Sequence, residues 1–247
     1  MSKHNYADLL KLSNSVRNIA FFDRHKRIKY KSQEIGVMRI IKLTIGLIAS
    51  RTPCFVYYRF KLYFIHRRIL KNHNVNLIIG AGYTNFENWI STDRCLLDVF
   101  KEDDWQRVLS GKKVNKLLAE HVIEHFSTED FVRLLFIIKK YMASNSVFRI
   151  AVPDGFFPNK DYIKSVRPGG YGPGADDHKV LYDFKKISSI VEGFGLNYDL
   201  IQYFDENGNF YSKYSDDNGY IQRSREHDHR NNRGGINYSS LIVDLYF

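Results

Sequence analysis

The stretch Val75-Asn76-Leu77-Ile78-Ile79-Gly80-Ala81-Gly82 decides the fold of this 247-residue chain. A short apolar run that ends at glycines is typical of a buried strand followed by a tight turn, because glycine lets the backbone turn sharply beside a ligand. Similar apolar runs follow along the chain, and we expect strands at residues 89–93, 114–119, 147–152, 196–204 and 238–246.

Amphipathic stretches separate these runs and predict helices. Asp104 is expected to cap a short helix, and Ser127 opens a longer one with Asp130 three residues later, as in a capping box. Asp183 is expected to cap a third helix, which Gly195 ends. Strand–helix alternation of this density predicts an α/β fold with a doubly wound, mostly parallel sheet.

The basic charge of the chain belongs to its N-terminal part. The net charge is +10, yet residues 1–76 alone hold 16 Lys/Arg against 3 Asp/Glu. We therefore expect residues 1–74 to form a basic, mainly helical extension. Apolar residues at helical spacing predict a helix that starts near Gln33, and a second helix is expected over 55–70. Three roles stay open for it: packing on the sheet domain, peripheral contact with an anionic membrane surface, or binding a polyanionic glycan or a second copy. A nucleic-acid partner is not expected from such an uneven charge.

Composition excludes several other classes. Cys54 and Cys95 cannot form a disulfide framework, and no Cys-x-x-Cys pair offers a zinc or redox motif. No secretory segment and no apolar run of about 20 residues is visible. We expect a cytoplasmic protein, with the inner face of the membrane as an alternative location.

The residues directly after each expected strand are the candidate site, because open α/β sheets bind ligands outside the carboxyl ends of their strands. Gly80 and Gly82 follow the first strand, and Asp93 ends the second, where a carboxylate can accept hydrogen bonds from a ribose diol. Since the third glycine of a dinucleotide motif is missing, an adenosine cofactor without phosphates fits better.

The chain resembles the class I S-adenosylmethionine-dependent methyltransferases, of the bacterial branch associated with capsule and lipopolysaccharide biosynthesis. The resemblance covers residues 75–247 and implies a seven-stranded, Rossmann-like sheet, S-adenosylmethionine as cofactor and methyl transfer as activity. It rests on 77–82 (LIIGAG), 88–93 (NWISTD), 119–125 (AEHVIEH), 149–155 (RIAVPDG), 169–180 (GGYGPGADDHKV), 203–208 (YFDENG), Arg223-Ser224 and 238–244 (YSSLIVD).

The same resemblance implies roles for single residues. Gly80 and Gly82 would pass under the methionine part of the cofactor, and Asp93 would hold the ribose hydroxyls. Asp98 would lie near the adenine. Glu120 and His121 would lie near the sulfonium and the incoming acceptor.

The glycine-rich loop from Arg167 to Lys179 is expected to bind the acceptor. Methyl transfer to a hydroxyl needs a base, and an imidazole with a pKa near ~6.5 suits that work, especially beside a carboxylate. We expect His178 as the base, oriented by Asp177 or Asp176, with His121 as the alternative. Tyr171 would contact the acceptor.

Further substrate contacts are expected from Asp154, Arg223 and Arg230. Paired guanidinium hydrogen bonds would suit an anionic acceptor, such as a phosphate-bearing sugar, a uronic acid or a nucleotide-linked precursor. Together with the resemblance, which implies methyl transfer and a capsule or lipopolysaccharide setting, these residues lead us to expect an O-methyltransferase that acts on a surface-polysaccharide component or its precursor.

A rival motif is present. His121-Val122-Ile123-Glu124-His125 spells the inverted zinc-peptidase signature, which needs a helix and a third protein ligand. Because it straddles a strand end, Glu124 and His125 are expected only to anchor the turn, and no metal is expected. Two alternatives to the methyltransferase stay open. One is a zinc-dependent hydrolase that uses this motif, and the other is a non-catalytic, membrane-associated binding module.

Overall fold

The computed structural model describes residues 54–231 and 235–247. The chain divides into two compact units, residues 1–61 and residues 62–247. The described part of the first unit is the start of helix α3 (Cys54–Lys71), which confirms the helix expected over 55–70. The helix expected from Gln33 lies outside the described residues.

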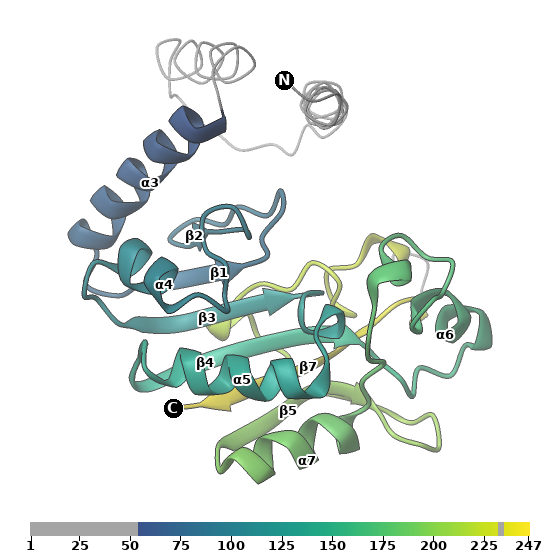
Figure 1. Cartoon of the computed structure of the whole chain (residues 1–247). Helices are drawn as coiled ribbons and strands as arrows, with labels where there is room; N and C mark the ends of the chain where they lie inside the picture. The colour runs from purple at the N-terminus through teal and green to yellow at the C-terminus, as the bar shows by residue number, and fades with distance from the viewer. Residues whose placement is uncertain (1–53, 232–234) are drawn as a thin grey trace, which may run out of the picture. The chain divides into compact units, whose positions relative to one another are not determined.

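The second unit is built on a seven-stranded sheet with the order β2-β1-β3-β4-β7-β5-β6 (Figure 1). Strands β1 to β5 run in one direction, and β6 and β7 run against them. The expected mostly parallel α/β sheet is therefore confirmed. The strands are β1 (Asn76–Ile79), β2 (Ile90–Ser91), β3 (Val114–Glu120), β4 (Met142–Pro153), β5 (Asn197–Phe204), β6 (Phe210–Ser212) and β7 (Ser240–Tyr246).

The strand order reverses between β1 and β3. In the strand order, β2 lies next to β1 toward one edge of the sheet, whereas β4 lies next to β3 toward the opposite edge. Because the two connections diverge there, a crevice is expected outside the carboxyl ends of β1 and β3. The residues that follow these two strands are Gly80 and His121.

Two strands differ from the sequence expectation. Strand β4 starts at Met142 instead of Val147, because Met142 pairs with Val114 and the next pair joins Val147 to Lys116. Residues 143–146 form an irregular bulge between these pairs. Strand β6 was not expected at all, and it pairs antiparallel with the end of β5.

Local capping explains where most helices begin. Helix α5 (Thr128–Lys139) is capped by Ser127, whose side chain accepts a hydrogen bond from Asp130 N, and α7 (Phe184–Phe194) is capped by Asp183 and ends at Gly195. Both caps were expected. The cap at Asp104 was wrong, because the N-cap of α4 (Glu102–Leu109) is Lys101, three residues earlier, and the Asp104 carboxylate accepts from Asp98 N. Helix α6 (Lys160–Val166) was missed.

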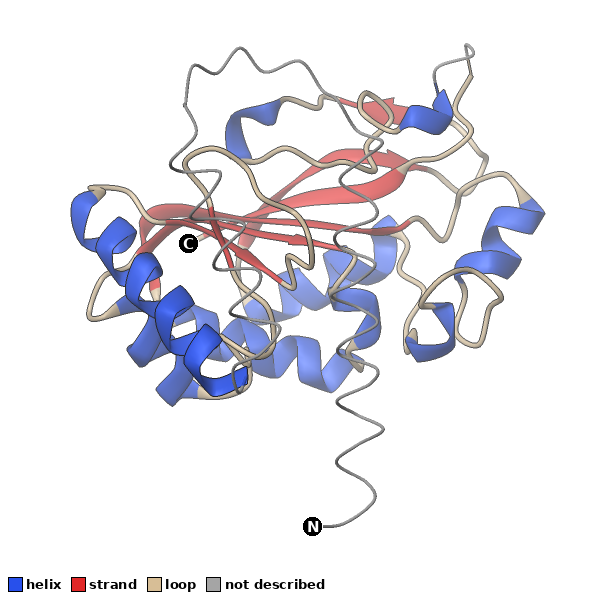
Figure 2. Ribbon diagram, turned by 90° about the horizontal axis from the view of Figure 1, so that it is seen from above, coloured by secondary structure: helices blue, strands red, loops and turns tan. Residues whose placement is uncertain are grey.

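The sheet has two differently covered faces. Helices α4, α5 and α7 lie in front of the sheet in Figure 1, and most of the helices stand on one side of it in Figure 2. Alternate strand residues face the other way, where loops around Trp89 and Ile221 cover them. The buried residues of this second layer are Ile78, Ala81, Trp89, Leu118, Ala151, Ile201, Ile221 and Ile242.

Helix α3 contributes Ile65 and Ile69 to the buried residues of the second unit. Their i, i+4 spacing places them on one face of the helix. Among the described residues, no helix combines the length and the apolar character needed to cross a membrane.

Candidate active site

Backbone hydrogen bonds bring the glycine turn and Asp93 together at the carboxyl ends of β1 and β2. Thr92 N donates to Ile78 O over 2.8 Å, and Ala81 N donates to Thr92 O over 2.8 Å. These two bonds extend the parallel pairing of the strands past their ends. The turn at 80–82 is therefore fixed beside the residue that precedes Asp93.

The two glycines of this turn have different surroundings. Gly80 and Gly82 both have positive φ, +60° and +52°, which L side chains rarely adopt. A Cβ on Gly80 would meet Val122 Cγ2 at 2.5 Å, whereas a Cβ on Gly82 would meet nothing within 4 Å. Gly80 thus permits close packing, and the backbone at Gly82 borders open space. The Asp93 carboxylate is half-buried, with Oδ1 accepting from Cys95 N.

Glu120 ends β3 and holds a distant loop. Its Oε2 accepts from Gln222 N over 3.1 Å and its Oε1 accepts from Arg223 N over 2.8 Å. Gln222 Nε2 also donates to Thr84 Oγ1 over 2.9 Å, so the loop is joined to the segment that follows the glycine turn as well. Burial raises the pKa of Glu120, and the nearby Arg223 charge opposes that rise.

His121 follows β3 directly and has a left-handed backbone, φ +54°, which is costly for a residue with a side chain. Its backbone N–H donates to Ala151 O over 2.8 Å, and its Nε2 lies 3.0 Å from Ser240 Oγ. Because Ser240 Oγ donates its single proton to Arg223 O, this hydroxyl accepts from His121 Nε2–H. The network therefore assigns the lone pair of neutral His121 to Nδ1.

Two arginines lie near His121. Arg230 is paired with Asp228 and lies over the Tyr238 ring at 3.3 Å. The Tyr238 ring in turn stacks on His121, with centroids 6.2 Å apart. Burial lowers the pKa of His121 well below its usual range, and the positive charges of Arg223 and Arg230 lower it further.

Glu124 lies at the centre of a histidine cluster. Its carboxylate is buried, with Oε1 3.3 Å from His121 Nδ1 and 3.9 Å from His178 Nε2. Among the described residues neither oxygen has a partner with hydrogen-bond geometry. Burial raises the pKa of Glu124 to about 8 and lowers the pKa of His125.

His178 belongs to the glycine-rich loop and lies beside this cluster. Lys179 N donates to Glu124 O over 2.8 Å, and His178 Nδ1 lies 2.6 Å from Val166 O. The expected pairing of Asp177 with His178 is wrong, because Asp177 Oδ2 lies 3.5 Å from His125 Nδ1 instead. A backbone carbonyl, Val166 O, orients His178 in place of a carboxylate.

Three other predicted residues are engaged elsewhere. The Asp98 Oδ1 atom accepts from Phe100 N in the turn before α4. Tyr171 is exposed, and its hydroxyl donates to Asp161 O over 3.0 Å. Asp176 is exposed and precedes Asp177 in the same short 3-10 helix. Contacts of these side chains with cofactor or acceptor stay predictions.

Asp154 follows β4 and is fully buried. Its Oδ1 accepts from Phe156 N over 3.0 Å and its Oδ2 accepts from Phe204 N over 2.8 Å. Burial raises the pKa of Asp154 to about 7, although these two hydrogen bonds oppose the rise. Its carboxylate thus ties the end of β4 to the end of β5 and presents no exposed atom to a substrate.

The zinc-peptidase interpretation of His121–His125 lacks its helix. His121 is left-handed, and only residues Ile123–His125 form a single 3-10 turn. Instead, Glu124 and His125 come together with His178, from 53 residues further along. The sequence motif contains two members of the cluster, but the third depends on the path of the glycine-rich loop. No local pattern could have shown that path.

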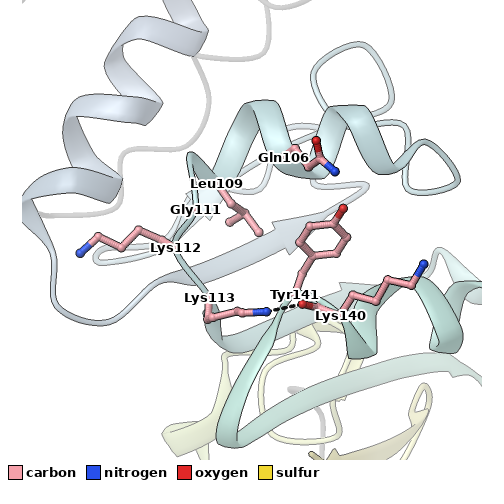
Figure 3. Close-up of a pocket in the computed structure, with 7 residues that line it drawn as sticks. All are labelled: Gln106, Leu109, Gly111, Lys112, Lys113, Lys140 and Tyr141. Atoms are coloured by element: carbon pink, nitrogen blue, oxygen red, sulfur yellow. Dashed lines mark hydrogen bonds between the residues drawn. The ribbon is translucent and has the colours of Figure 1, made fainter.

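A separate hollow of about 150 Å³ lies between the segment before β3 and the end of α5 (Figure 3). The residues that line it are Gln106, Leu109, Gly111, Lys112, Lys113, Lys140 and Tyr141. Since Lys113 precedes β3, this hollow lies at the amino end of that strand. It is therefore separate from the candidate site at the carboxyl ends.

Comparison with known proteins gives structural matches alone. No protein-family model and no curated protein matches the chain. A SAM-dependent methyltransferase from Archaeoglobus fulgidus is 15% identical, with 76% of this chain and 93% of that chain covered and a TM-score of 0.38. Magnesium protoporphyrin IX methyltransferase from Synechocystis, with SAH bound, is 10% identical, with 96% and 98% covered and a TM-score of 0.35. A SAM-dependent methyltransferase from Anabaena variabilis is 11% identical, with 73% and 70% covered and a TM-score of 0.35. TM-scores this low leave the function to be argued from the residues of the chain.

Proposed function

We propose that this chain is an S-adenosylmethionine-dependent O-methyltransferase. The supporting observation is the position of the glycine turn and Asp93, which hydrogen bonds fix beside the β1/β3 reversal of the sheet. Ligands of open α/β sheets bind at such a reversal. The residues fit an adenosyl compound, because Gly82 borders open space and Asp93 offers carboxylate oxygens to a ribose diol.

The bound cofactor would supply an electrophilic methyl group. Gly80 and Gly82 would hold its methionine part, Asp93 its ribose and Asp98 its adenine. Glu120 shapes the wall next to it by holding the backbone of Gln222 and Arg223. The chain would accelerate transfer by aligning the acceptor with the methyl group, which is worth several kcal/mol in a well-oriented pair.

We propose His121 as the group that takes the acceptor proton. It stands at the end of β3 between Arg223, Arg230 and Tyr238, and its Nδ1 has the lone pair. Both histidines approach the buried Glu124, with Oε1 3.9 Å from His178 Nε2 and 3.3 Å from His121 Nδ1. The choice of His121 over His178, the first expectation, therefore rests on its place at the end of β3 beside Tyr238 and Arg223. The attacking oxygen would form its bond to the methyl carbon as the carbon–sulfur bond breaks, with the proton passing to His121.

The half-exposed Arg223 guanidinium beside His121 favours an anionic acceptor, whereas Arg230 is already paired with Asp228. We propose a surface-polysaccharide component of capsule or lipopolysaccharide, or its nucleotide-linked or phosphate-bearing precursor. A uronic acid would place a carboxylate within reach of Arg223, whose guanidinium is half-exposed. Peripheral membrane contact through the basic N-terminal part would suit such a precursor and stays a prediction.

Transfer of label from methyl-labelled S-adenosylmethionine tests this function. UDP-glucuronic acid and UDP-glucose form a matched pair of acceptors, since they differ in one carboxylate. We expect label in the uronic acid derivative, and a loss of about 100-fold or more in the His121→Gln variant. Arg223→Ala should reduce the preference for the acid, whereas exposed Arg225→Ala should not. Absence of label with these and with extracted polysaccharide precursors would contradict the proposal.

A further inference from the structure

The cluster of Glu124, His125 and His178 has the composition of a metal site. One ligand atom of each residue lies within 4.8 Å of the others, and Glu124 is buried. We propose that these three residues bind one divalent transition-metal ion, with zinc as the best-suited ion. The proposal does not depend on methyl transfer, and it differs from the peptidase motif because His178 replaces His121 as a ligand.

The unpartnered carboxylate is the first argument. Both oxygens of Glu124 and the Nδ1 atom of His125 are buried without a hydrogen-bond partner among the described residues. Buried polar atoms are rarely left so, and an unexplained group calls for an ion or another ligand. A cation between the carboxylate and the two imidazoles would give the buried Glu124 oxygens a partner.

The orientation of His178 is the second argument. Its Nδ1 lies 2.6 Å from Val166 O, which can only accept, so Nδ1 has the proton and Nε2 has the lone pair. A backbone carbonyl that fixes the tautomer of a ligating histidine in this way is typical of metal centres. The lone pair on Nε2 faces Glu124 Oε1 at 3.9 Å.

The distances are compatible with a small ion after modest adjustment. Zinc binds nitrogen and carboxylate oxygen at about 2.0–2.2 Å, so ligand atoms of a tetrahedral site lie about 3.3–3.5 Å apart. The present spread of 4.8 Å requires a contraction of about 1.5 Å or less. Side-chain rotation of His125, which stands in a short 3-10 turn, can supply much of it.

The ligand set indicates which ion is preferred. Imidazole nitrogens suit zinc, copper, nickel and iron, whereas magnesium and calcium prefer oxygen alone. Two histidines and one glutamate form a three-ligand zinc set that keeps a position open for water or a substrate oxygen. The ion would also join the glycine-rich loop, which contains His178, to the turn after β3.

Metal titration of the full chain tests the site. After removal of metals with a chelator, Zn²⁺ is titrated in competition with a chromophoric chelator, and Co²⁺ is added as a spectroscopic probe. We expect one tight equivalent of Zn²⁺, a tetrahedral Co²⁺ spectrum, and no competition by Mg²⁺. Removal of a residue that only hydrogen-bonds to a metal ligand costs about 10- to 100-fold in metal affinity. Glu124→Gln and His178→Ala alter the ligands themselves, so each should lower the Zn²⁺ affinity by at least about 100-fold.

His229→Ala is the matched control, because His229 is exposed and stands apart from the three ligands. It should bind Zn²⁺ as the unaltered chain does. Circular dichroism shows whether each variant is folded, and Zn²⁺ should raise the unfolding temperature of the unaltered chain but not of Glu124→Gln. The proposal is overturned if the folded, unaltered chain binds no Zn²⁺, or if folded Glu124→Gln and His178→Ala bind it unchanged.

Discussion

Gly80 and Gly82 share a left-handed backbone but differ in their surroundings, which predicts different costs for the same substitution. Gly82→Ala should cost about 1–2 kcal/mol of unfolding free energy from the backbone alone. Gly80→Ala should cost about 2–4 kcal/mol, because its Cβ would also collide with Val122 Cγ2. Urea unfolding measures both values.

Val122→Ala in the Gly80→Ala background removes the colliding methyl groups and should recover part of the loss. Equal costs for the two glycine substitutions, with no recovery, would show that Val122 does not pack on Gly80 as described.

Asp154 predicts a pH dependence of stability. Its pKa is about 7 in the folded chain against 3.8 for the ordinary group, so between these values the folded state binds the extra proton. The contribution of Asp154 to the free energy of unfolding should therefore fall as pH rises from about 4 to about 7, by an amount on the order of 4 kcal/mol.

Asp154→Asn cannot ionise and is the comparison. The unfolding free energy of the unaltered chain minus that of the variant, measured by urea unfolding at several pH values, should decrease across this interval. A constant difference would mean that Asp154 titrates normally in the folded state.

Several residues could be placed at the carboxyl edge of the sheet from the sequence, because strand ends are local features. Gly80, Gly82, Asp93, Glu120 and His121 each follow or end an apolar run, and the carboxyl ends of parallel strands meet at one edge. The partner of His178 could not be predicted, since it depends on how a loop of glycines folds back. Glu124 was interpreted as a turn anchor for the same reason.

At the scale of elements, a buried ion pair joins β4 to β7 and to a loop. Arg149 and Asp244 face each other in register, are both about 1% exposed, and form two hydrogen bonds of 2.7 and 2.8 Å. Arg149 Nη1 also donates to the carbonyl oxygens of Ser215 and Gly219. The pair thereby fixes residues 215–219 beside the sheet.

Asp244→Ala should cost about 3–5 kcal/mol of unfolding free energy, because it leaves a buried guanidinium without its charge partner. The double variant Arg149→Met with Asp244→Leu removes both charges and should cost less than the single one. Urea unfolding of the three proteins checks this order. A small effect of Asp244→Ala would show that the pair is open to water.

Two helix starts could be predicted from local residues, whereas the extent of two strands depends on their neighbours in the sheet. Ser127 and Asp183 cap helices through bonds to residues three positions later, so the local sequence contains the whole signal. Strand β6 has three residues and exists because it pairs with β5. The start of β4 similarly depends on Val114 of a neighbouring strand.

At the scale of the whole molecule, the sheet order creates the candidate site. Because the connections diverge after β1 and β3, a crevice is expected at their carboxyl ends, with the loop held by Glu120 beside it. Alternation of strands and helices predicted this class of sheet. The sequence pattern could not predict that loops around Trp89 and Ile221 cover the face of the sheet opposite α4, α5 and α7, because irregular segments have no periodicity.

The central claim is that the crevice at Gly80, Gly82 and Asp93 binds S-adenosylmethionine, and calorimetric titration of the full chain measures it directly. We expect one molecule of cofactor per chain and no detectable binding in Asp93→Ala. Asp103→Ala removes an exposed acid of α4 and should bind as the unaltered chain does. Absence of binding to the unaltered chain, or equal affinity in folded Asp93→Ala, would contradict the claim.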